Sequence, residues 1–458
     1  MNTIYKSSLA ISLLLAAASC ESSLDLDPVL STTESKIFSD KTKIEGNLLG
    51  IYSDVKYQLA YKGRAYQDVR GEDIADLTQN VNECYTVYEM AVSLTSADNS
   101  DTWSQLYRSI NEANTFLANL DKAHDVVGAS YDRYVAEAKF LRAFSYYNLN
   151  LLYSYPYKVN PDGLSVPLRL KAESSTNDND LARSTVSQVF SQILDDLSDE
   201  NIAKLPSGGN SYDGITRATQ AAAHTLRQRI YLEKEDWKNV ISEGNAVTGY
   251  ELEPTVADVF SKSINKEVIF SFPMADNNKG ATQYAQAYYY STGNIFIVDN
   301  TYGFLALPNY SLSADTRISK LIIKSGEKYL LNKYPDSKNY LDWVPQFRYA
   351  EVLLNQAEAY ANQGDTKNAV ALLEQVRHRS IAAADDPLNV ASLTGKELLT
   401  AIYNERRAEF VGEGIRSIDI HRRAADYVKR NGTFTVNSNG YVWPIPTSER
   451  SANKLITD

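Results

Sequence analysis

The stretch from Phe347 to Ser380, FRYAEVLLNQAEAYANQGDTKNAVALLEQVRHRS, decides the fold because its pattern is that of two antiparallel helices. Small residues such as Ala357 recur in its first half and are followed by a large ring at Tyr360. Gly364 then ends the first helix with the residue type that tolerates a left-handed C-cap. Ala369 places a small residue on the inner face of the second helix, where the two backbones approach closely. The stretch therefore predicts a tightly packed helical hairpin.

The order and spacing of these small and large residues are typical of a tetratricopeptide repeat, although the opening Trp of that repeat is absent. An ordinary helical hairpin would share the apolar period but would not need the order small, large, Gly, small. We therefore favour a repeat unit over an isolated hairpin.

Two further regions also have the pattern of a helical hairpin. Arg217 to Val247 holds two helical patterns around a tight turn, and Trp103 to Tyr153 holds two long patterns rich in alanine and aromatic residues. Because such units bury their inner faces only by stacking on one another, three of them predict an all-α tetratricopeptide-repeat scaffold. We expect its helices at about residues 101–153, 184–247 and 347–429.

Composition narrows the class of protein. The chain has 458 residues, and its 43% hydrophobic content suffices for a sizeable core, which we expect to form one domain over residues 31–458. The net charge of -11 and the lack of a long Lys/Arg run argue against nucleic acid as a partner. Tyrosine is frequent, with 32 residues against 13 Phe, and it suits wet binding surfaces as well as cores.

The first 19 residues have the pattern of a lipoprotein signal peptide. Lys6 supplies a positive start, and the apolar run from Leu9 to Ala18 is too short to span a membrane. Cys20 stands where a bacterial lipoprotein signal is cut, so we expect acylation of its thiol, although such signals usually carry Leu at the position of Ala17. Residues 20–30 would then be the lipidated tether and the only membrane anchor. The alternative is an ordinary secretory signal with a chance cysteine.

Two irregular regions are the predicted ligand site. Residues 250–345 form a loop-rich insertion in which short β-like runs alternate with Gly, Asn and Pro, and Arg70 to Glu89 mixes acids and amides with tyrosines. Rings stack on sugars or line peptide grooves, and Asp and Asn bond hydroxyls or amides. The candidates are Asp73, Asp76, Asn80, Asn82, Tyr85, Tyr88, Tyr284, Tyr288, Tyr289 and Tyr290. Consecutive tyrosines in a strand alternate faces, so at least one of them is expected to pack inward.

Catalytic and metal motifs are weak. Glu405, Glu409 and Glu413 stand four residues apart, as a glycosidase pair might, but the interleaved Arg406, Arg407 and Arg416 favour structural ion pairs. The four histidines show no metal-binding spacing, so we expect no metal site and no cofactor.

Six motifs occur in order along the chain. They are the Cys20 signal followed by SSLDLDP, W-x2-LY-x2-I-x2-AN from Trp103, EAKFLRAFSYYNL from Glu137, RYAEVLL-x2-AEAYA from Arg348, ERRAEF-x2-EGIRSIDIHR from Glu405, and PIP-x2-E-x3-N from Pro444. In this set the chain resembles the SusD/RagB family, surface lipoproteins of Bacteroidetes. The Gln-Asn-Pro-Gly-Tyr tail that often ends the family is missing, and the chain is short for it.

The resemblance implies four tetratricopeptide repeats, a variable loop face that captures nutrient, and no catalysis. It implies a SusC/RagA-like TonB-dependent transporter as partner, against which the repeat side packs while the protein acts as a lid. The ligand would be an oligosaccharide or a peptide, and the protein would sit on the outer membrane at the cell surface. Two alternatives remain, namely a secreted repeat scaffold that binds proteins and, with less support, a glycan-cleaving enzyme.

Overall fold

The computed structural model describes residues 34–80, 84–175, 179–292 and 295–456. The predicted signal peptide and the whole predicted tether, including Cys20, lie outside these residues. Among the described residues, no helix combines the length and apolar character needed to cross a membrane.

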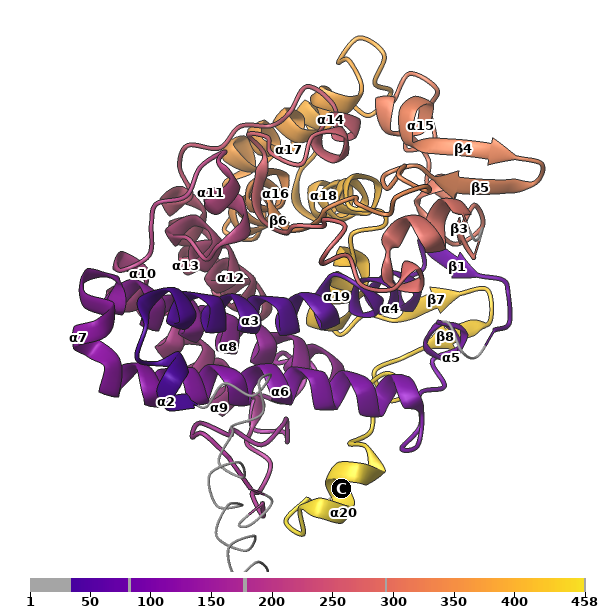
Figure 1. Ribbon diagram of the computed structural model, residues 1–458. Coiled ribbons are helices and arrows are strands. Elements are labelled where there is room, and N and C mark those ends of the chain that lie inside the picture. Colours follow the sequence, from indigo (N-terminus) through magenta and orange to yellow (C-terminus); the bar gives the residue numbers. More distant parts are fainter. Residues whose placement is uncertain (1–33, 81–83, 176–178, 293–294, 457–458) are drawn as a thin grey trace, which may run out of the picture.

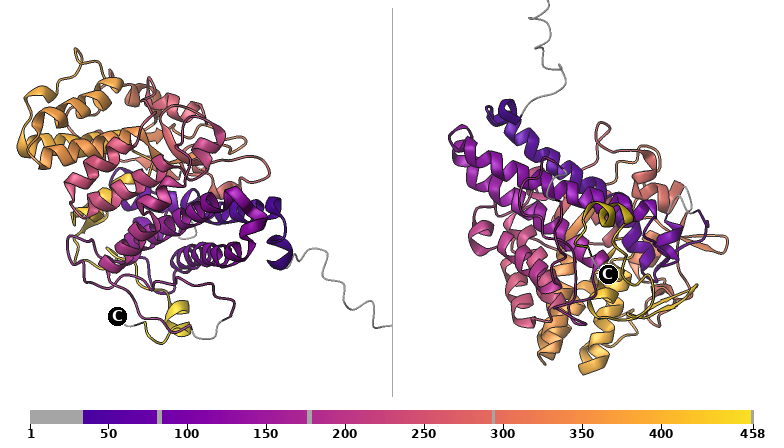
Figure 2. Two further views of the ribbon diagram at one scale, coloured as in Figure 1. Left: turned by 90° about the vertical axis from the view of Figure 1, so that its left-hand side faces the viewer. Right: turned by 90° about the horizontal axis from the view of Figure 1, so that it is seen from below.

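Long helices dominate and pack side by side as consecutive pairs (Figure 1). The pairs are α6 (Ala97–Leu120) with α8 (Tyr131–Tyr153), α12 (Gln220–Glu233) with α13 (Trp237–Ala246), and α16 (Tyr349–Asn362) with α17 (Thr366–Ser380). Helices α3 (Lys41–Leu59) and α9 (Val186–Asp196) pack on α6 and α8, and α13 packs on α16, which joins the second pair to the third. The stack rises from α6 at the bottom of Figure 1 to α17 near the top, and Figure 2 shows its layers from the side. The predicted helical scaffold is confirmed.

The hairpin that predicted the fold has the expected contacts. Ala357 and Ala369 are both fully buried, and Gly364 adopts a φ of +81° in the turn between their helices. Asp365 caps α17 by accepting a hydrogen bond from the backbone N–H of Asn368. The small side chains therefore lie where the two helices meet, and the glycine supplies the left-handed turn that joins them.

The other helices are shorter, except α18, and connect or cover this stack. They are α2 (Glu34–Ile37), α4 (Lys62–Arg70), α5 (Tyr85–Tyr88), α7 (His124–Val127), α10 (Asp199–Ala203), α11 (Tyr212–Thr216), α14 (Val256–Ser261), α15 (Thr316–Leu321), α18 (Gly395–Glu409), α19 (Ile415–Arg422) and α20 (Thr447–Ala452).

Short strands form separate antiparallel pairs. These are β1 (Ile74–Asp76) with β3 (Phe296–Val298), β2 (Val268–Phe272) with β6 (Val344–Arg348), β4 (Ile322–Ser325) with β5 (Lys328–Leu331), and β7 (Tyr427–Lys429) with β8 (Gly432–Phe434). The β-like runs of the insertion thus become strands β2, β3 and β5. Because β6 leads directly into α16, its pairing with β2 ties both ends of the insertion to the helical stack.

Two local predictions needed correction. The stretch from Arg70 to Glu89 is not wholly irregular, because it contains β1 and α5, and the insertion also holds α14 and α15. Thr185 caps α9 and forms a capping box with Gln188. One hydrophobic cluster includes residues from Ile44 in α3 to Ile445 near the C-terminal end, so the insertion and the helices share a core.

Candidate functional site

Pairing of β1 with β3 brings the two predicted ligand regions together. Ile74 lies opposite Val298, and the backbone N–H of Asp299 donates to the carbonyl of Asp73 at 2.8 Å. These strands lie beside α5, β7 and β8 at the right of Figure 1. The juxtaposition that the ligand hypothesis requires is therefore present, although more than 200 residues separate the strands in sequence.

Asp73 and Asp76 do not face solvent. Asp73 is 2% exposed, and its Oδ1 accepts from Arg407 Nη2 at 2.8 Å and from the backbone N–H of Phe304 at 2.7 Å. Asp76 is fully buried, and its Oδ1 accepts from the hydroxyl of Thr78 at 2.7 Å. This burial does not fit the predicted ligand contacts. The two acids instead hold the strand and the loops around it in place.

The three consecutive tyrosines are also mainly structural. Tyr289 and Tyr290 are fully buried, and the Tyr289 ring stacks on Phe296 with centroids 4.9 Å apart. The Tyr290 hydroxyl donates to Asp68 Oδ2 at 2.7 Å, and burial raises the pKa of Asp68 to about 7. Tyr288 is partly buried and packs edge-to-face against Tyr289. The full burial of both rings does not fit direct ligand contact by Tyr289 and Tyr290.

The remaining candidates differ in exposure. Asn80 is exposed, Tyr85 is partly exposed, and Tyr88 is only 4% exposed beneath it, with the two ring centroids 6.1 Å apart. Asn82 lies outside the described residues. Tyr284 ends the 3-10 turn Thr282–Tyr284, and its side chain is not among those described. Among the described candidates, Asn80, Tyr85 and Tyr288 therefore have side-chain surface that a ligand can reach.

The turn between β7 and β8 supplies a cation that sequence reasoning missed. Arg430 forms an ion pair with Asp299, and its Nη2 donates to Asn300 Oδ1 at 3.1 Å and to Thr301 Oγ1 at 3.3 Å. One third of the Arg430 side chain remains exposed. The neighbouring Tyr302 is 40% exposed. No local motif marks Arg430, since its partners lie about 130 residues away in sequence.

Lys429 holds together the strand and helices that lie beneath this surface. Its Nζ donates to the carbonyls of Val69 at 2.5 Å and Tyr88 at 2.6 Å, and it lies 4.3 Å from the centroid of the Tyr88 ring. Burial lowers the pKa of Lys429 to about 7. The lysine thus joins β7 to the ends of α4 and α5. We call the exposed residues that these contacts support the β1–β3 rim: Asn80, Tyr85, Asn300, Tyr302 and Arg430.

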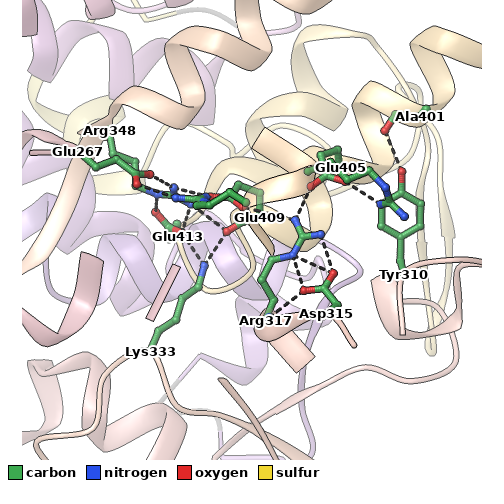
Figure 3. Close-up of polar contacts among 12 residues, drawn as sticks. Glu267, Tyr310, Asp315, Arg317, Lys333, Arg348, Ala401, Glu405, Glu409 and Glu413 are labelled. Carbon is green, nitrogen blue, oxygen red and sulfur yellow. Dashed lines mark hydrogen bonds and ion pairs between the residues drawn. The ribbon is translucent and has the colours of Figure 1, made fainter. Parts of the chain in front are cut away.

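The three glutamates four residues apart are buried in an ion-pair network (Figure 3). Glu405 pairs with Arg317 and Arg377, Glu409 with Arg348 and Arg379, and Glu413 with Lys333 and Arg348. Ion pairing was predicted correctly, but the predicted partners were wrong. Arg406 pairs with Asp419, Arg407 with Asp73, and Arg416 with Glu72. The reason is geometric, because adjacent helix residues point to different faces.

This network removes the glutamates from any role at an open site. Burial alone would raise the pKa of Glu413, but Arg348 and Lys333 outweigh that effect and hold its pKa below the ordinary value. Among residues 34–80, 84–175, 179–292 and 295–456, no group of three His, Cys, Asp or Glu side chains is arranged to hold a metal ion.

Comparisons with known proteins define the family. A family model described as starch-binding and associating with the outer membrane matches residues 23–232, and the SusD family model matches residues 308–458. A SusD superfamily protein from Bacteroides fragilis, known from a crystal structure, is 46% identical to this chain. It covers 92% of this chain and 100% of its own, with a TM-score of 0.89. The chain belongs to the SusD/RagB family.

More distant relatives also match this chain over nearly its whole length. SusD-like protein P25 from Formosa agariphila is 24% identical over 97% of this chain and 96% of its own length. A laminarin-binding SusD-like protein is 22% identical, with a TM-score of 0.72 and coverage of 91% of this chain and 99% of its own. The second similarity establishes a shared fold across nearly the whole length of both proteins.

Proposed function

We propose that this protein is a lipid-anchored outer-membrane protein that captures an oligosaccharide and delivers it to a TonB-dependent transporter, for which it acts as a lid. Family membership supports binding rather than catalysis, and the family model is described as starch-binding and associating with the outer membrane. The laminarin-binding relative favours a glycan over a peptide. The lipid anchor and the transporter partner rest on the Cys20 signal and on the family resemblance.

The observation that carries the proposed binding site is the β1–β3 rim. Tyr85 presents part of an aromatic ring on α5, and Tyr88 and Lys429 hold that helix from below. Exposed amides at Asn80 and Asn300 and the guanidinium of Arg430 lie on the loops that follow β1 and β3 and in the turn between β7 and β8, next to α5 (Figure 1). A flat ring beside fixed polar groups is the arrangement that stacks on a sugar and bonds its hydroxyls.

The candidate catalytic residues of the glycan-cleaving alternative are buried. A glycosidase needs two carboxyl groups on either side of an open substrate site. Glu405, Glu409 and Glu413 are at most 3% exposed and each is paired with cations, so they do not supply that arrangement. Release of new reducing ends from a glycan by the purified protein would overturn the non-catalytic assignment.

Calorimetric titration with maltohexaose, laminarihexaose and a mixed peptide library tests the binding site. Tyr85→Ala should weaken binding of whichever glycan the wild type takes by about fivefold, since one ring contact is worth on the order of 1 kcal/mol. Arg430→Gln should weaken it as well. Tyr212→Ala is the control, because it removes a ring that is 52% exposed on α11, away from the rim. Full affinity in folded Tyr85→Ala protein would exclude the rim, and binding of peptides alone would exclude the glycan.

A further inference from the structure

A groove lies between the end of α13 and the hairpin of α16 and α17. Its volume is about 510 Å³, which lies within the range of small-ligand pockets. Buried residues of α16 form its floor, and exposed residues of α17 and of the turn after α13 form its walls. Helix α13 lies at the left of Figure 1, whereas the β1–β3 rim lies at the right. We call this second concave site the α13–α17 groove.

The lining of the α13–α17 groove is polar but uncharged. Of the whole chain 22% is charged, yet no Asp, Glu, Lys or Arg is among the described residues that line the groove. Its polar groups are amides, such as Asn245 and Gln375, and hydroxyls, such as those of Tyr349 and Tyr360. A charged group that entered the groove would lose water without gaining an ion-pair partner. The lining therefore favours an uncharged ligand.

Gln356 supplies a hydrogen-bond acceptor at the floor of the groove. This side chain is 6% exposed, and its Nε2 donates to the carbonyl of Ile241 at 3.2 Å and to Asn245 Oδ1 at 2.8 Å. Both amide hydrogens are thereby used, which fixes the orientation of the amide. Within the part of the chain that the structure describes, no group donates to Gln356 Oε1. Because a buried acceptor without a partner is unfavourable, this oxygen is suited to accept from a ligand.

The neighbours of Gln356 hold its amide in place and add a donor. A Cβ atom at position 244 would lie 2.5 Å from Gln356 Cδ, so Gly244 makes the room that the amide occupies. Since Asn245 accepts from Gln356 through Oδ1, its Nδ2 remains a donor on the exposed wall of the groove. An acceptor next to a donor matches hydroxyl groups, which can donate and accept at once.

The shape of the groove suits a linear ligand. Tyr349, Leu353, Gln356 and Tyr360 lie on one face of α16, and all four line the groove. A helix rises 1.5 Å per residue, so the two tyrosines lie about 16 Å apart along its axis. Part of each tyrosine ring is exposed. Rings at both ends with amides between them can contact successive sugars of one chain and bond their hydroxyls.

We propose that the α13–α17 groove is a second saccharide site that binds a linear, uncharged oligosaccharide. The proposal rests on the proposed function, because it assumes that the protein captures glycans. Gln356 Oε1 and Asn245 Nδ2 bond hydroxyls, and Tyr349 and Tyr360 contact sugar rings. A neutral glycan carries no charge at any position, whereas about one residue in four of an average protein is charged. The uncharged lining therefore favours a saccharide over a protein segment.

Calorimetric titration of the full chain with maltohexaose and laminarihexaose tests the proposal, because it measures both affinity and the number of sites. Wild type should bind two molecules of the preferred hexasaccharide per chain, one at the β1–β3 rim and one in the groove. Ala371→Trp places a large ring at an exposed position of the groove and should leave one site. Ala203→Trp makes the same change at an exposed position of α10, outside the groove, and should keep two.

A second variant changes one atom of the site with little change in shape. Asn245→Asp keeps the oxygen that accepts from Gln356 and replaces the free donor Nδ2 by a carboxylate oxygen. It should weaken binding in the groove by about fivefold, the loss typical of one neutral hydrogen bond. Asn389→Asp is the control, because it places the same charge at an exposed position outside the groove and should leave both affinities unchanged.

The outcomes separate this proposal from the proposed function. Equal numbers of sites and equal affinities in wild type, folded Ala371→Trp and folded Asn245→Asp would overturn the groove and leave glycan capture at the rim intact. A single wild-type site that Ala371→Trp abolishes would support the groove and exclude the rim. Displacement of the hexasaccharide by an uncharged peptide of Gly, Ser and Asn at equal concentration would assign the groove to protein segments. If neither hexasaccharide bound, both proposals would fail.

Discussion

Arg348 Nη1 lies 2.6 Å from Glu409 Oε1, and the two side chains are 2% and 0% exposed. Arg348 ends β6 and stands at the N-terminus of α16, while Glu409 ends α18. Arg348 also pairs with Glu267 and Glu413, at 2.6 and 2.7 Å. One guanidinium therefore joins the end of the loop-rich insertion to the helical stack.

Replacing Arg348 should destabilise the protein strongly. Arg348→Met leaves buried carboxylates without their main cation, and breaking a buried pair from one side typically costs about 3 to 5 kcal/mol. The matched control is Lys266→Met, because the pair of Lys266 with Glu251 is exposed on both sides and such pairs contribute about 1 kcal/mol or less. Urea unfolding measures the loss of stability in both variants. Equal midpoints for the two variants would contradict a stabilising role for the buried network.

Glu233 should make stability depend on pH. Burial raises the pKa of Glu233 to about 7, above its ordinary value of 4.5. The folded state then binds a proton that the unfolded state has lost, so the free energy of unfolding falls as pH rises between these values. Glu233→Gln cannot ionise and should exceed wild type by about 3 kcal/mol more at pH 8 than at pH 4. Parallel stability curves for the two proteins across this range would refute the shift.

Tyr290→Phe should separate packing from ligand binding. The change removes the hydrogen bond to Asp68 and leaves a buried carboxyl group with fewer donors, which typically costs about 1 to 3 kcal/mol. Glycan affinity should not change, because Tyr290 is fully buried. Thermal unfolding and titration on the same sample give both values. Weaker binding by a fully folded variant would return Tyr290 to the ligand site.

Ala357→Leu should overpack the contact between α16 and its neighbours. Ala357 is fully buried, and adding bulk to a packed core typically costs about 1 to 3 kcal/mol. Ala371→Leu makes the same change at an exposed position of α17 in the same hairpin and should have little effect. Denaturant midpoints compare the two, and an unchanged midpoint for Ala357→Leu would place this residue outside the helix interface.

Cys20→Ala should abolish lipidation. Acyl chains contribute about 0.8 kcal/mol per buried methylene group, and two such signals give stable anchoring. The variant should therefore leave the outer-membrane fraction and lose incorporation of labelled palmitate. If it fractionated with the outer membrane as fully as wild type and its transporter was absent, the lipoprotein prediction would be wrong.

The sequence by itself determined the helical stack. The hairpin around Gly364 was predicted with its buried Ala357 and Ala369, because helix periodicity, caps and small contact residues are properties of neighbouring positions. The short β-like runs of the insertion were also predicted, and they form strands β2, β3 and β5. These features depend on residues only a few positions apart, so they can be predicted without knowing the tertiary contacts of the chain.

Only the tertiary structure decided which polar and aromatic residues remain available to a ligand. Tyr85 and Tyr290 look alike in sequence, but Tyr290 is enclosed by Phe296 and bonded to Asp68, whereas part of the Tyr85 ring stays exposed. Arg430 joined the rim because β7 lies beside the loop after β3. The exposure of a side chain depends on which segments, distant in sequence, pack against it. The periodic pattern of one segment does not predict that packing.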